Sequence, residues 1–248
     1  MRKNLSPFDR LNGKKVVIFG KVYDRYELHL IRARLERKAR KWTAKTGVHI
    51  SFTLTAKLEL VIAIGTNPHK NQHCEAMSRH EHCICHDCYS RACKYTATNR
   101  NTAENYDVLN DHIIPVSEWF DLEGYPLVRI EWSGDLASIV QAQNYINFIN
   151  RNPLSHFGWW TKHLNYVCPL FDLDGKPANV SLVYSSPVVG VPAHIPAKWL
   201  HYVDHRFTVY DVPQNDSVIN CGKRDCVGCQ KCYIHDGTTP FDIAEAKK

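Results

Sequence analysis

The chain has 248 residues, 23% of them charged and 44% hydrophobic, and its formal net charge is +6. A chain of this length can bury roughly 70 to 75% of the surface that its unfolded state exposes, so it needs no disulfides to compensate for a small core. Its first residues, MRKNLSPFDRLNGKK, are charged and polar, and no apolar run behind them is long enough for a signal peptide or a membrane span. We therefore expect a cytoplasmic protein without a membrane partner, in a compartment where clustered cysteines more often hold metal than pair in disulfides.

The positive charge is concentrated near the start of the chain. Residues 1–50 contain 14 of the 31 Lys and Arg but only 4 of the 25 Asp and Glu. Such an asymmetry favours a polyanionic partner, nucleic acid or a nucleotide. No Gly-rich phosphate loop of a common type is present, which argues against nucleotide hydrolysis through a P-loop.

The first predicted elements are a strand and a long helix. The apolar run 16–19 predicts a strand, and apolar residues at helical spacing predict an amphipathic helix over about 25–45 that stops at Gly47. This basic helix is either a solvated face packed on the core or a surface that tracks phosphates. Its outer face carries Arg32, Arg34, Arg37, Lys38, Arg40, Lys41 and Lys45.

Strands and helices then alternate along the chain. Predicted strands cover 48–54, 58–64, 127–132, 156–160, 179–184 and 206–212, and predicted helices cover about 137–150 and about 197–203. Alternation of this kind favours crossover units and a mostly parallel sheet. With six or seven strands, the sequence predicts one α/β domain over 1–248, a partial or small β/α barrel. A Cys/His-rich insertion at 69–93 and a Cys-rich segment at 221–232 are the expected metal-binding insertions.

The C-terminal segment CGKRDCVGCQKC has the stronger metal signal. Its cysteines, Cys221, Cys226, Cys229 and Cys232, are separated by gaps of four, two and two residues. The repeated gap of two resembles the ferredoxin type of iron–sulfur ligation. Zinc ribbons usually pair two short knuckles across a longer loop. We therefore expect an iron–sulfur cluster here, [4Fe–4S] in type, with zinc as the alternative.

A second group of cysteines lies upstream: Cys74, Cys83, Cys85, Cys88 and Cys93. The gaps of two and four in Cys85, Cys88 and Cys93 resemble an unusual radical S-adenosylmethionine signature, that of the thiamin pyrimidine synthase family. The resemblance implies three thiolates that leave one iron open to S-adenosylmethionine as cofactor. The commoner signature of that superfamily is absent, because position 81 is Glu. Nearby imidazoles suit zinc equally: His73, His80, His82 and His86.

Polar residues follow three of the predicted strands. In parallel α/β proteins, chemistry gathers at the carboxyl ends of the strands. The candidates are Ser133 and Asp135, then Thr161 and Lys162, then Ser185 and Ser186. We predict catalytic roles for Asp135, Ser133 and Lys162, with Asp135 as a base or a ligand of a ribose hydroxyl and Lys162 as a ligand of phosphate or carboxylate. The alternatives are a helix cap for Asp135 and ordinary surface for Lys162.

With these motifs in place, the chain resembles the phage gene product 88 family of cysteine-rich proteins. The matching features, in conserved order over about 74–235, are Cys88-Tyr89 with an upstream cysteine, RIEWSGD (129–135), WWTK (159–162), NVSLVYSSP (179–187) and GKRDCVGCQKCY (222–233). Departures are the extra Cys85 and Cys93, the histidine-rich insertion and the basic helix. The resemblance implies a phage or prophage origin, the host cytoplasm and a barrel-like α/β fold, but no particular reaction.

Two functions follow as expectations. The first is an iron–sulfur enzyme of radical or redox type, with the barrel mouth as its pocket and a nucleotide, nucleic acid or peptide as substrate. The second is a metal-stabilised, non-enzymatic effector that binds nucleic acid or a host protein through its basic helix. A cysteine-nucleophile hydrolase is disfavoured, because clustered thiols compete for metal. The lone Cys168 reads as a small buried hydrophobe.

Overall fold

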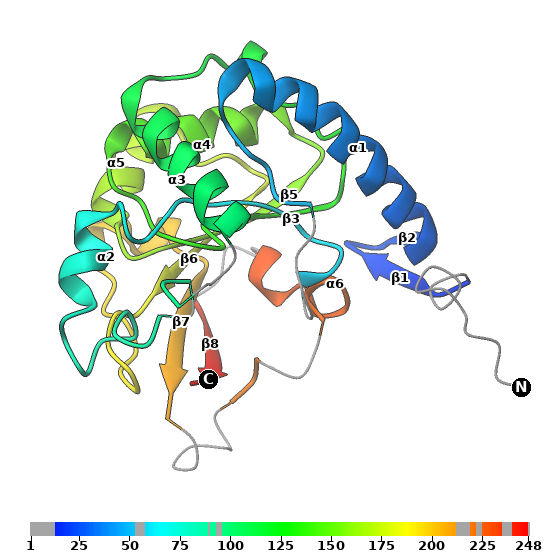
Figure 1. Ribbon diagram of the computed structural model, residues 1–248. Coiled ribbons are helices and arrows are strands. Elements are labelled where there is room, and N and C mark those ends of the chain that lie inside the picture. The colour runs from blue at the N-terminus through cyan, green and yellow to red at the C-terminus, as the bar shows by residue number, and fades with distance from the viewer. Residues whose placement is uncertain are drawn as a thin grey trace, which may run out of the picture.

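A six-stranded parallel sheet forms the centre of the molecule (Figure 1). The computed structural model describes residues 13–52, 58–88, 90–92, 96–211, 219–221, 225–234 and 240–247. The strands are β3 (Ile62–Ile64), β4 (Leu127–Ile130), β5 (His156–Thr161), β6 (Val180–Ser185), β7 (His205–Tyr210) and β8 (Phe241–Ala246). Every neighbouring pair is parallel, and the spatial order equals the chain order. The predicted α/β class with a parallel sheet is confirmed, and within the described ranges the sheet does not close into a barrel.

Helices occupy the connections between the strands. They are α1 (Arg25–Thr46), α2 (Gln72–Met77), α3 (Thr96–Asp111), α4 (Ile139–Arg151), α5 (Leu164–Asp174) and α6 (Cys226–Cys229), with 3₁₀ turns η2 (Val116–Glu118), η3 (Ala197–Tyr202) and η4 (Lys231–Tyr233). When sequential strands stay in order, right-handed crossovers place helices such as α4 and α5 on the same face of the sheet. None of the described helices is long and apolar enough to span a bilayer.

Alternate residues of β5 show what covers each face of the sheet. Trp159 packs against Tyr145 of α4 and Phe171 of α5, so this face belongs to the crossover helices. Gly158 and Trp160 point the other way. Trp160 contacts the ring of Tyr233 in η4, and a side chain at Gly158 would meet the backbone oxygen of Cys232 at 3.0 Å. The second face therefore holds the C-terminal cysteine segment.

The N-terminal strand does not join this sheet. The run predicted at 16–19 appears as β1 (Lys15–Ile18), but it pairs antiparallel with β2 (Lys21–Asp24) in a separate hairpin. The reason is local: Phe19 and Gly20 both have positive φ, 48° and 77°, which produces the two-residue turn that joins antiparallel strands. The helix predicted at 25–45 is confirmed as α1, which begins at its N-cap Asp24 and ends at Gly47 with φ 73°.

Two further strand predictions need correction. In the described part of 48–54 there is no strand, only a single antiparallel bridge from Ser51 to Ala63. Residues 53–57 lie outside the described ranges. The strand predicted at 58–64 shortens to Ile62–Ile64. At the other edge, β8 completes the sheet, although the sequence did not predict it.

The turn after β4 tolerates only glycine at its tightest point. Gly134 has φ +80°, and an added Cβ would lie 2.5 Å from the Thr66 carbonyl oxygen. We expect Gly134→Ala to lower the free energy of unfolding by about 2–4 kcal/mol, since strain and backbone overpacking add. Urea unfolding measures it. Gly190→Ala is the matched control, because Gly190 also has positive φ (+75°) but no atom within 4 Å of the added Cβ; it should cost only about 1 kcal/mol. Equal losses in the two variants would contradict the close approach to Thr66.

Candidate functional site

Both cysteine groups line one cavity of about 380 Å³. Cys74, Cys85 and Cys88 come from the N-terminal group and Cys221, Cys226 and Cys232 from the C-terminal group. The candidates Ser133, Asp135, Thr161, Lys162 and Ser185 line the same cavity. The sequence showed two separate cysteine groups and left the number of metal centres open; the fold brings cysteines of both groups to a shared space at the carboxyl ends of β4, β5 and β6.

Both carboxylate oxygens of Asp135 accept hydrogen bonds at the edge of the cavity. Its side chain is 2% exposed. Oδ1 accepts hydrogen bonds from Thr161 Oγ1 at 2.7 Å and the Leu136 backbone N–H at 2.9 Å. Oδ2 accepts from the Lys162 backbone N–H at 3.1 Å and lies 3.4 Å from Lys162 Nζ. The alternative role of Asp135 as a helix cap is wrong, because Ser138 caps α4 by accepting the Gln141 N–H.

Lys162 is held inside the site as an ammonium. Burial lowers its pKa, but the charges of Asp135, Cys85 and Cys74 outweigh burial and raise the pKa above its usual value. Its side chain is 17% exposed, so the alternative of an ordinary surface lysine is wrong. Lys162 reaches the cavity because the ends of neighbouring parallel strands meet at one edge of the sheet; its predicted role stays a prediction.

The three serine candidates differ in what they do. Ser133 is buried, and its carbonyl accepts the Thr66 N–H at 2.9 Å, which joins the ends of β3 and β4. Ser185 lines the cavity. Ser186 does not; its hydroxyl donates to the Val191 carbonyl at 2.6 Å and organises the loop after β6.

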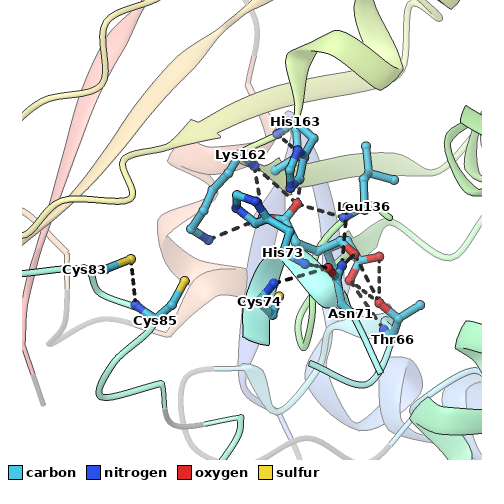
Figure 2. A network of polar contacts seen from close by, with 12 residues as sticks. Thr66, Asn71, His73, Cys74, Cys83, Cys85, Leu136, Lys162 and His163 are labelled. Atoms are coloured by element: carbon cyan, nitrogen blue, oxygen red, sulfur yellow. Dashed lines mark hydrogen bonds and ion pairs between the residues drawn. The ribbon is translucent and has the colours of Figure 1, made fainter. Parts of the chain in front are cut away.

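Asn71 links Cys74 to the end of the sheet. This residue caps α2 by accepting the N–H groups of His73 and Cys74, while its Nδ2 donates to the Asp135 carbonyl at 2.8 Å. Cys74 is thereby fixed beside the Asp135–Lys162 pair (Figure 2).

Three thiols of this group are buried, those of Cys74, Cys83 and Cys85, while Cys88 is partly exposed. The Cys85 backbone N–H donates to Cys83 Sγ at 3.4 Å. Burial raises the pKa of Cys85 to about 12, with Lys162 acting against it. Burial and then Asp135 raise the pKa of Cys74 still further. Cys83 is buried but does not line the cavity, and Cys93 lies outside the described residues.

The histidines of the insertion stand apart from the thiols. His80, His82 and His86 are exposed, and none of the four candidate histidines lines the cavity. His73 instead packs edge-on against His163, with 4.1 Å between ring centroids. Burial, followed by the charge of His163, lowers the pKa of His73.

The C-terminal cysteine segment is held by the N-terminal part of the chain. Asp225 caps α6 through the Gly228 N–H and pairs with Arg25 of α1 at 2.8 Å. Gln230 accepts from the Phe19 N–H at 3.1 Å and donates to the Val17 carbonyl at 2.5 Å. These contacts fix α6 on the hairpin, opposite the crossover helices (Figure 1).

Cys232 lies close enough to the other three C-terminal cysteines for them to affect its pKa. Burial raises the pKa of Cys232; Arg129 opposes this, and Cys221, Cys226 and Cys229 add to it. None of the nine cysteines that the structure describes forms a disulfide. In the described ranges, no three His, Cys, Asp or Glu side chains are already arranged to hold a metal ion. The donor set fits a soft metal or cluster by chemistry, and coordination requires the thiols to move closer on binding.

Glu131 is a site residue that the sequence did not reveal. It follows β4 with φ 56°, and its carboxyl group accepts from Tyr145 Oη at 2.7 Å and Gln141 Nε2 at 2.5 Å. Burial raises its pKa to about 8. The run RIEW was predicted as continuous strand, and no glycine marks the left-handed residue. Arg129 was missed too; its Cζ lies 3.9 Å from the Trp160 ring centroid, next to Cys232.

The basic face of α1 is partly neutralised within the chain. Arg34 and Lys38 both pair with Glu123, and Arg40 pairs with Glu36. Arg32 donates to the Glu59 carbonyl. Within the described ranges three exposed basic residues of α1 form no ion pair: Arg37, Lys41 and Lys45.

Comparison with known proteins gives one match. A family model described as gene product 88 matches residues 28–239. This range contains both cysteine groups and all the residues that line the cavity except Glu245, Ala246 and Lys247. No similar curated protein was found. No similar solved structure was found either. Because the match spans most of the chain, the protein belongs to the gene product 88 family.

Proposed function

We propose that this chain is an iron–sulfur enzyme of radical or redox type and that the shared cavity is its active site. One observation carries the proposal: cysteines from both groups line the same cavity, beside a buried lysine–aspartate pair at the ends of parallel strands. A structural metal site needs no cavity, whereas a catalytic one needs access for a substrate. In this proposal the open sheet corresponds to part of a β/α barrel, and the active site lies at the carboxyl ends of its strands.

Each cysteine group would have its own task. Cys221, Cys226, Cys229 and Cys232 would hold a [4Fe–4S] cluster, which supplies one-electron chemistry that side chains cannot. Cys85, Cys88 and Cys93, with Cys74 and Cys83 beside them, would hold a second centre with S-adenosylmethionine as a candidate cofactor. Zinc is the alternative metal for either group. All these thiols must stay reduced, as they do in the cytoplasm of a host cell.

The chain's own residues would bind and orient the substrate. Asp135 is engaged with Thr161, Leu136 and Lys162, so its part is to hold the Lys162 ammonium in place. Lys162 would then contact a negatively charged part of the substrate. A nucleotide, a nucleic acid end or a peptide all carry such groups.

The second candidate is a non-enzymatic effector in which metal only stabilises the fold. It would bind nucleic acid or a host protein through α1, and the three exposed residues Arg37, Lys41 and Lys45 support it. The pairing of Arg34 and Lys38 with Glu123 reduces that surface. We therefore rank it second.

Anaerobic purification followed by metal, sulfide and absorption analysis separates the two functions. For the enzyme we expect a brown protein with broad absorption near about 400 nm and bound iron and sulfide. A colourless protein with stoichiometric zinc would contradict the iron–sulfur proposal and favour the effector. The same preparation loaded with iron and sulfide shows whether low iron reflects oxidative loss, since reconstitution should restore the spectrum.

A further inference from the structure

The Lys162 ammonium has unused hydrogen-bonding capacity inside the cavity. An ammonium carries three donors. Among the described residues its only acceptor is Asp135 Oδ2 at 3.4 Å, longer than the 2.7–2.9 Å that is usual for a charge-assisted bond. Asp135 meanwhile accepts shorter bonds from Thr161 and Leu136. Asp135 thus holds the Lys162 ammonium in position but leaves hydrogen-bond donors of the ammonium unused.

Arg91 provides a second cation with an open donor. Its Nη2 pairs with Glu75 at 2.8 Å, while its Nη1 is buried and has no hydrogen-bond partner in the part of the chain that the structure describes. Its backbone N–H donates to the Cys88 carbonyl, and Glu75 directly follows Cys74 in α2. Arg91 and Lys162 therefore line the same cavity at the end where the N-terminal cysteines lie.

The charged lining of the cavity favours a negative ligand. Its basic residues are Arg91, Arg129, Lys162 and Lys247, and its acidic residues are Asp87, Glu131, Asp135 and Glu245. Because burial raises the pKa of Glu131 to about 8, this residue carries little charge at neutral pH and leaves the basic side in excess. A buried N–H donor that has no acceptor is energetically costly, and the oxygens of an anionic ligand would accept from the unused donors of Lys162 and Arg91.

We propose that the substrate carries a carboxylate or a phosphate and that this acidic group binds to Lys162 and Arg91. The apolar walls formed by Trp132, Trp160 and Phe207 would cover the organic part. This inference rests on the proposed function in taking the cavity as the active site. Anion binding itself needs no cluster, so the two ideas can fail separately.

The test is calorimetric titration of the purified full chain with phenyl phosphate, benzoate and neutral benzyl alcohol. Two variants remove the cations: Asp135→Asn with Lys162→Met, which leaves no uncompensated charge, and Arg91→Gln. The matched control is Lys176→Met with Asp204→Asn, because Lys176 and Asp204 form another largely buried pair that does not line the cavity. Thermal unfolding of each variant verifies folding.

We expect an acidic probe to bind to the wild-type chain and the control equally, and about 10- to 100-fold more weakly to either cation variant. Binding of only phenyl phosphate or only benzoate would identify which acid the site takes. The proposal is overturned if neither acid binds to the wild type, if benzyl alcohol binds as tightly as the acids, or if the control weakens as much as the cation variants. A colourless preparation that takes up no iron and sulfide on reconstitution but still binds an acid through these residues would refute the iron–sulfur function alone.

Discussion

Replacing Cys226 and Cys229 together with serine is expected to abolish metal binding by the C-terminal segment and to lower stability by several kcal/mol. The two residues begin and end α6, one helical turn apart, so we expect both thiols in one coordination group. Serine oxygen is a poor ligand for the soft metals that thiolates bind. In small zinc domains metal binding contributes about 10–16 kcal/mol to folding; here α6 also has hydrogen-bonded contacts with the hairpin, so we expect a smaller share. Elemental analysis and urea unfolding measure the two effects.

Cys168→Ala is the matched control for this pair. Cys168 is fully buried in α5 and belongs to the apolar core, away from both cysteine groups. Its removal leaves a small cavity worth about 1–2 kcal/mol, without a change in bound metal per chain. Full metal content in the Cys226→Ser, Cys229→Ser variant would exclude the C-terminal segment as a metal site.

The elements that the sequence predicted well are those specified by local signals. Helix α1 has an apolar stripe, an N-cap at Asp24 and a stop at Gly47, all visible in one stretch of chain. The strands β4, β5 and β6 are near-continuous apolar runs because both faces of the sheet are covered. By contrast, only two of the six residues of β8 (FDIAEA) are buried. Its sequence therefore has no strand-like hydrophobic pattern that would predict its pairing with β7.

The site shows the same division between local and long-range information. Asp135 and Lys162 could be expected near one another because a parallel sheet aligns the ends of its strands. The meeting of the two cysteine groups depends on contacts between distant segments: Gln230 with the hairpin, and the backbone of Cys232 packed closely over Gly158. Neither contact has a sequence signature. Glu131 was missed because its left-handed backbone is imposed by its surroundings and not by a glycine.

Glu131 should make the stability of the protein fall steeply as pH rises. Burial is the main cause of its raised pKa; the Tyr145 hydrogen bond opposes it, and the charge of Asp135 adds to it. The folded state therefore holds a proton up to about pH 8, whereas the unfolded chain releases it near the ordinary value of 4.5. The stabilisation is complete below that lower value and is lost as pH rises through about 8. Between about pH 5 and 9 we expect a loss of roughly 4–5 kcal/mol in the free energy of unfolding, measured by urea titration.

Glu131→Gln should remove this pH dependence, because the amide keeps an acceptor for Tyr145 and a donor for Thr66 but cannot ionise. The variant should be similar to the wild type at pH 5 and clearly more stable than it at pH 9, a gain produced by removing an acid. Glu36→Gln, an exposed-face change on α1, should keep the wild-type slope, since Glu36 lies at the surface beside Arg40. A Glu131→Gln chain that loses stability with pH as fast as the wild type would show that this carboxyl group is ionised in the folded state. Asp135 and Glu131 would then both be negative beside Lys162, and the excess of positive charge inferred for the cavity would be smaller.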